Sequence, residues 1–139
     1  MRVVTTTLGT TLLALIVAAA AEAGPARQCV EQSETLVGQR AMLADKDTLV
    51  PRKLRSVAPD YPTRQGSSKM LSSIWLGEAL VAQDGKVRDV WTIRPLRFEP
   101  AWPEFEEAIR ASIRQTVYEP VVVDGKATPV CVTISVFVH

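Results

Sequence analysis

The stretch that decides the fold is LSSIWLGEALVAQDGKVRDVWTIR, residues 71–94. Residues 71–83 alternate as a β-strand does, and residues 87–94 form a return strand after the turn residues Asp84 and Gly85. Glycine tolerates the positive φ that a tight hairpin turn demands. The first strand has one small-residue face that can accept a helix and a second face that is also largely apolar. The first face carries Trp75, Gly77, Ala79 and Val81, and the second carries Ile74, Leu76, Glu78 and Leu80.

A helix and a final strand follow this hairpin. Residues 103–116 place apolar side chains at helical spacing, and Pro103 suits the first helical position. After a second glycine turn at Asp124 and Gly125, residues 130–139 (VCVTISVFVH) are rich in β-branched side chains. The order strand, hairpin, strand, helix, strand predicts an α+β fold in which helices cover a short antiparallel sheet.

The N-terminal residues are typical of an export signal. Arg2 precedes the uncharged apolar run Leu8–Ala21, and Ala21-Glu22-Ala23 offers the small residues that a signal peptidase reads. The alternative is a retained inner-membrane anchor, but a membrane-spanning helix needs about 20 apolar residues. We therefore expect a periplasmic protein after cleavage, with 139 − 23 = 116 residues, about one domain. The predicted organisation is a signal peptide at 1–23, an N-terminal segment with a loose helical face at 24–50, and a domain at 51–139.

Composition argues against several function classes. Sixteen basic and fifteen acidic residues give a formal net charge of +1, which offers no electrostatic case for binding nucleic acid. The single histidine is the terminal His139, so a zinc site lacks ligands and a Ser-His-acid triad would depend on that one residue. The seven glycines form no nucleotide-binding loop. We predict a non-enzymatic protein with no metal and no cofactor.

The two cysteines, Cys29 and Cys131, suggest one disulfide bond in an oxidising compartment. The bridge would tie the start of the exported chain to its last strand. Closing a loop of roughly 100 residues contributes up to about 4–5 kcal/mol in the chain-entropy account. The alternative is a pair of independent buried thiols.

Several motifs occur in an order that resembles TonB C-terminal domains. The resemblance covers roughly residues 54–138 and implies a three-stranded antiparallel sheet with two helices packed on it, the first helix falling near residues 63–69. TonB proteins also carry a long proline-rich linker, whereas residues 24–50 contain only Pro25. The motifs are Ala58–Pro62 (APDYP), Asp84–Val87 (DGKV), Phe105–Arg114, Val117–Val121 (VYEPV), Asp124–Val130 (DGKATPV) and the closing Phe137.

The family resemblance implies a binding mechanism in which the last strand, at the edge of the sheet, receives an extended peptide. The expected partner is an outer-membrane receptor or another envelope protein, with a link to transmembrane transport. Ile134→Pro is expected to remove a backbone donor from the last strand. Pairing with a second copy, or coverage by residues 24–50, remains the alternative for a structural or self-associating envelope protein. The predicted edge residues are Val132, Thr133, Ile134, Ser135, Val136 and Phe137.

Overall fold

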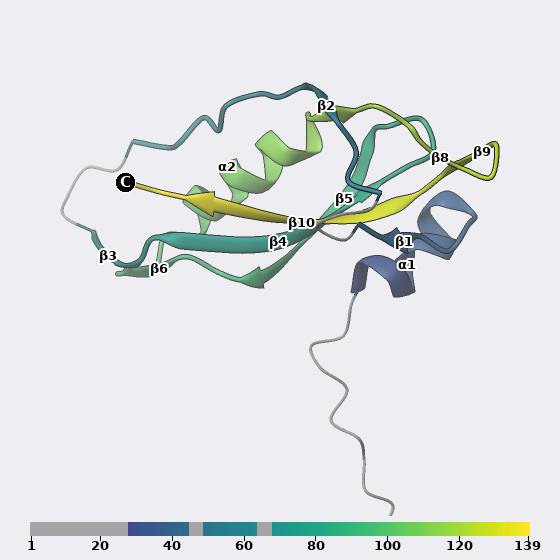
Figure 1. Ribbon diagram of the computed structural model, residues 1–139. Coiled ribbons are helices and arrows are strands. Elements are labelled where there is room, and N and C mark those ends of the chain that lie inside the picture. The colour runs from purple at the N-terminus through teal and green to yellow at the C-terminus, as the bar shows by residue number, and fades with distance from the viewer. Residues whose placement is uncertain (1–27, 45–48, 64–67) are drawn as a thin grey trace, which may run out of the picture.

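The computed structural model describes residues 28–44, 49–63 and 68–139, so the predicted signal peptide lies outside the described residues. These residues have a mixed α+β architecture with two helices (Figure 1). No helix in the described ranges is long and apolar enough to span a bilayer. The helices are α1 (Gln28–Val37) and α2 (Pro103–Arg114). The strands of the main sheet are β1 (Met42–Leu43), β4 (Ile74–Val81), β5 (Val87–Arg94) and β10 (Val130–Phe137).

The main sheet has the strand order β1-β10-β4-β5. The pairs β10–β4 and β4–β5 are antiparallel, which confirms the predicted hairpin and the position of the last strand beside it. The expectation of three strands was wrong, because β1 adds a fourth strand that runs parallel to the start of β10. The segment that forms β1 is too short and too exposed to show a strand alternation in the sequence.

Three two-stranded ribbons extend the main sheet. The β3–β6 ribbon continues the β4–β5 hairpin past breaks at Ser73 and Pro95. The β2–β7 ribbon joins the proline-rich residues 51–62, here called the entry segment, to the chain after α2. The β8–β9 hairpin turns at Asp124 and Gly125, both of which have positive φ. The ribbon strands are β2 (Lys53–Arg55), β3 (Lys69–Ser72), β6 (Arg97–Glu99), β7 (Val117–Tyr118), β8 (Val121–Val123) and β9 (Lys126–Thr128).

The two helices cover opposite faces of the main sheet. Helix α2 packs on the predicted small-residue face, where Trp75 and Ala79 meet the apolar stripe of the helix. Helix α1 packs on the second face, where Leu80 and Cys131 lie against Cys29. Because Ala79 and Leu80 are adjacent in β4, their side chains point to opposite sides. The helix stripe that enters the larger core consists of Phe105, Ile109 and Ile113.

Of the predicted helices, α2 agrees with the sequence pattern, and the two expected before it differ from the structure. Helix α2 falls where the periodicity predicts it, and Pro103 is its first residue. Helix α1 confirms a helical face in the N-terminal segment but ends at Val37, where Gly38 takes positive φ. Of the helix expected near residues 63–69, positions 64–67 lie outside the described residues. Thr63 has no regular secondary structure, and Lys69 begins β3.

Gly85 is required by the hairpin between β4 and β5. Its φ is +81°, and a Cβ at this position would lie 2.0 Å from the carbonyl oxygen of Tyr118. The close approach exists because the Tyr118 N–H donates to the Gly85 carbonyl at 2.8 Å. The turn therefore fixes both the hairpin and the chain that leaves α2.

Candidate functional site

All six residues of the predicted binding edge lie in β10, the strand that stands between β1 and β4 in the order of the sheet. Pairing with β4 is continuous from Val130 opposite Val81 to Phe137 opposite Ile74. Pairing with β1 involves only Val130 and Cys131. Strand β10 is therefore an internal strand for its first two residues and an edge strand for the rest.

Backbone hydrogen bonds determine which β10 residues face β4. The Val138 N–H donates to the Ser73 carbonyl at 2.9 Å. Because backbone groups alternate sides along a strand, the even-numbered residues of β10 point their N–H and C=O groups toward β4. Ile134, which pairs with Gly77, is one of them. Ile134→Pro would thus remove a donor from the last strand, but this donor faces β4, so the variant would disrupt the sheet and does not test the free edge.

The odd-numbered residues of β10 face the other side. The carbonyl of Cys131 accepts the Ala44 N–H at 2.9 Å, and that of Pro129 accepts the Met42 N–H at 3.0 Å. Beyond Cys131, no hydrogen bond within the described ranges occupies the outward N–H and C=O groups. These groups form a free window five residues long, and its outward-facing residues are Thr133, Ser135 and Phe137.

Strand β1 shows that this edge accepts a parallel strand. Its two residues, Met42 and Leu43, have exposed side chains, so they contribute little burial of their own. The strand is held by its surroundings: the Ser33 hydroxyl accepts the Ala41 N–H at 2.8 Å. Within the described part of residues 24–50, coverage of β10 is therefore confirmed for Val130 and Cys131.

The predicted disulfide bond between Cys29 and Cys131 is present, with a Cα–Cα distance of 6.0 Å. Both cysteines are buried, together with Leu80 and Ala41, in the smaller core under α1. The bridge fastens α1 to β10 at the residue where β1 stops. The alternative of two independent thiols is excluded, because neither cysteine is free.

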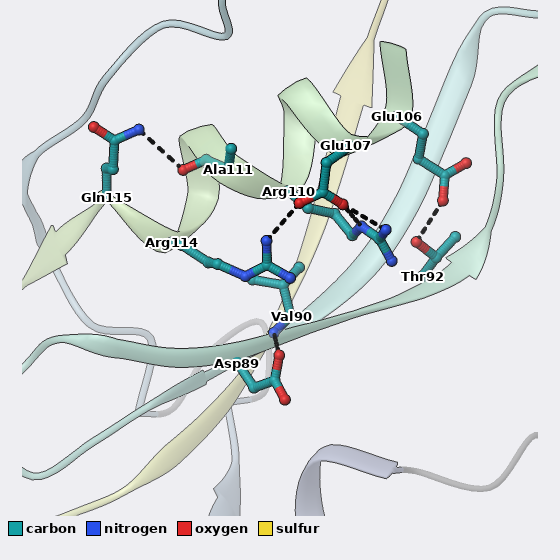
Figure 2. A network of polar contacts seen from close by, with 9 residues as sticks. All are labelled: Asp89, Val90, Thr92, Glu106, Glu107, Arg110, Ala111, Arg114 and Gln115. Atoms are coloured by element: carbon teal, nitrogen blue, oxygen red, sulfur yellow. Dashed lines mark hydrogen bonds and ion pairs between the residues drawn. The ribbon is translucent and has the colours of Figure 1, made fainter. Parts of the chain in front are cut away.

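The opposite edge of the sheet, at β5, has one outward N–H group that a carboxylate occupies. Because the odd-numbered residues of β4 face β10, its even-numbered residues face β5, and Leu80 pairs there with Asp89. Val90 is the next residue, so its N–H points outward, and it donates to the Asp89 carboxylate at 2.8 Å (Figure 2). A charged side chain that occupies outward groups is a common protection of edge strands. Within the described residues, one outward group of β5 is thus occupied, whereas the window of β10 has none occupied.

Above the free edge, the entry segment flanks α2. The Ser112 hydroxyl donates to the Val57 carbonyl, and the Tyr61 ring stacks on Phe105 with centroids 4.2 Å apart. On its other flank, α2 bonds to β5, where the Thr92 hydroxyl donates to Glu106 at 2.7 Å. The segment 57–61 therefore lies on the β10 side of the helix. Burial raises the pKa of Tyr61, so its phenol stays neutral at physiological pH.

The outer surface of α2 carries an ion-pair network that stabilises the helix. Glu107 accepts hydrogen bonds from Arg110 at 2.6 Å and from Arg114 at 2.8 Å (Figure 2). The hydrogen bond from Arg114, followed by that from Arg110, lowers the pKa of Glu107 below its usual 4.5. All three side chains are substantially exposed, so solvent screening limits the strength of the network.

Glu107→Gln is expected to lower the free energy of unfolding at pH 7 by at most about 0.5–1 kcal/mol. A lowered pKa in the folded state means that this stabilisation is present above the usual carboxyl pKa and disappears as the pH falls through the lowered value. Urea unfolding of both proteins at pH 7 and at pH 3 measures the difference. A difference in the free energy of unfolding between the two proteins that is larger at pH 3 than at pH 7 would contradict this account.

No group of three or more His, Cys, Asp or Glu side chains in the described ranges could hold a metal ion. A groove of about 600 Å³ lies beside the N-terminal end of α2, and its Glu106 carboxylate already binds Thr92. The groove is lined by Leu71, Leu96, Arg97, Phe98, Glu99, Ala101, Trp102, Pro103 and Glu106.

No protein-family model matches the chain, and no curated protein matches it.

Proposed function

We propose that this protein is a non-enzymatic periplasmic adaptor whose β10 edge binds an extended peptide of an outer-membrane receptor or another envelope protein. The motifs that resemble TonB C-terminal domains support this function, together with export through the N-terminal signal. The observation that carries the proposal is the free window from Thr133 to Phe137, next to a strand that already pairs with the same edge. A partner peptide would bind by strand addition.

Backbone pairing alone gives only weak binding at this edge. Three outward residues offer six backbone groups, and each hydrogen bond contributes a net of about 0.5–1.5 kcal/mol. Ordering each residue of the peptide costs about 1–2 kcal/mol of conformational entropy. The two terms are similar in size, so useful affinity and selectivity depend on side-chain contacts beside the strand.

Ser135→Pro is the direct test of edge pairing. The Ser135 N–H faces away from β4, so proline removes an outward donor and places its ring against an incoming strand while the β4 ladder remains. We expect capture of envelope proteins from a detergent extract to fall at least about tenfold. The thermal midpoint should change little.

The matched control is Val122→Pro. Val122 is 62% exposed and pairs with Ala127 between the pairs Val121–Thr128 and Val123–Lys126, so its N–H also points outward from a ribbon. It should capture partners as the wild type does. If folded Ser135→Pro protein retained every partner, strand addition at β10 would be the wrong mechanism.

Self-association through the same edge is the second candidate function. An antiparallel pair of windows centred on Ser135 would place Phe137 of one copy opposite Thr133 of the other, which would cover an exposed aromatic ring. Sedimentation velocity of the wild type and of Ser135→Pro distinguishes the two functions. A stable dimer that the proline variant abolishes favours the self-associating protein, and a monomer at micromolar concentration favours the adaptor.

A further inference from the structure

Phe137 is an aromatic residue that the fold leaves uncovered. It is 63% exposed at the end of β10, and its neighbour across the sheet is Ile74 of β4. Its side chain lies on the second face of the sheet, the face that α1 covers at Cys131 and Leu80. The other end of this face has no helix over it among the described elements, so Phe137 stands beside the free edge with its ring open to solvent.

The same face is apolar toward Phe137 and polar toward β1. Ile74 and Leu76 are only half-buried, whereas Thr133 and Ser135 carry small hydroxyl side chains. Ser135 lies opposite Leu76, and Thr133 lies opposite Glu78. An added strand would therefore encounter a gradient along the edge, with hydroxyl groups near β1 and an apolar surface near the C-terminal end.

The register of an added strand follows from the sheet geometry. Residues opposite Thr133, Ser135 and Phe137 would project their side chains onto this same second face, with Cβ atoms about 4.5–5.5 Å from those of their partners. Strand β1 sets one limit of the site, because Ala44 already bonds to Cys131. The peptide can therefore occupy about five residues, with one position directly beside the ring of Phe137.

We propose that the β10 edge selects a short extended peptide with a bulky apolar side chain, preferably aromatic, opposite Phe137 and with small or polar side chains opposite Ser135 and Thr133. This selection rests on the proposed function of the edge and names the class of peptide that it takes. The bulky side chain of the peptide covers Phe137 and extends the apolar surface that Ile74 and Leu76 form on this face. Aromatic cross-strand pairs are among the more favourable pairs in sheets.

The test uses the oxidised full chain and six labelled synthetic peptides. One is an N-acetylated, C-amidated pentapeptide of threonine with a lysine tail, and the other five each carry one phenylalanine at a different position. Fluorescence anisotropy measures their dissociation constants. We expect phenylalanine at one position, or at two positions of the same parity, to tighten binding about 3- to 10-fold relative to the all-threonine peptide.

Phe137→Ser should remove this preference and leave the weak binding of the all-threonine peptide. Val122→Ser is the matched control, because Val122 is equally exposed on β8, and it should keep the preference. If all six peptides bound the wild type with equal affinity and lost that binding in Ser135→Pro, the proposed selection would be overturned and the edge function would stand. Absence of binding by any peptide up to millimolar concentration would overturn the edge function itself.

Discussion

Replacing Cys29 and Cys131 together with alanine is expected to lower the free energy of unfolding by about 2–5 kcal/mol. The bridge joins residues 102 positions apart, so its loss releases a long loop in the unfolded chain. It also frees α1, whose contact with the sheet centres on the buried pair. Urea unfolding of the wild type and of the double variant measures the difference.

Wild-type protein in the presence of a reductant is the control for the cysteine variant, because the reduced chain should unfold at nearly the same urea concentration. The larger core under α2 contains neither cysteine and should keep its near-ultraviolet signal in both samples. A loss of stability below about 1 kcal/mol would contradict the role given to the bridge.

Trp75→Ala is expected to lower the free energy of unfolding by about 3–5 kcal/mol. Trp75 is fully buried in the core between the sheet and α2, where Phe105, Ile109 and Val90 also lie. Truncation removes a large apolar contact and leaves a cavity that the surrounding helix and strands fill only in part. Equilibrium unfolding followed by circular dichroism at 222 nm gives the value.

Gly77→Ala tests the packing of the Trp75 ring against the backbone of β4. A Cβ at residue 77 would lie 2.1 Å from Cη2 of Trp75 and 2.7 Å from the carbonyl oxygen of Trp91, so the indole ring must move. We expect a loss of about 1–3 kcal/mol in the wild type and a smaller loss in the Trp75→Ala background, where the ring is gone. Equal losses in the two backgrounds would show that the ring does not rest on Gly77.

The sequence predicts the elements whose patterns are local. The strand predicted over residues 71–83 is β4 over residues 74–81, with residues 71–72 in β3, and the helix predicted over residues 103–116 is α2 over residues 103–114. The predicted turn at Asp84 and Gly85 joins β4 to β5. The disulfide could also be predicted, because two cysteines in a chain with an expected export signal have one pairing available. Local pattern and cysteine count therefore define the hairpin, α2 and the bridge.

The features that depend on pairing between distant segments could not be predicted. Strand β1 consists of Met42 and Leu43, whose exposed side chains carry no period, and its place is set by α1 and by the hydrogen bond from Ala41 to Ser33. The direction of each β10 backbone group depends on register with β4, which side-chain alternation does not determine. For this reason Ile134 could be assigned to the strand, but its N–H could not be assigned to a side.

Amide hydrogen exchange of β10, followed by NMR on the oxidised full chain, tests the central claim most directly. The free-edge account predicts fast exchange at Thr133, Ser135 and Phe137 and slow exchange at Ile134 and Val136, whose N–H groups face β4. The three fast amides should become protected when the best phenylalanine peptide is added. Slow exchange at all three in dilute protein without peptide, or no added protection at peptide saturation, would contradict the account.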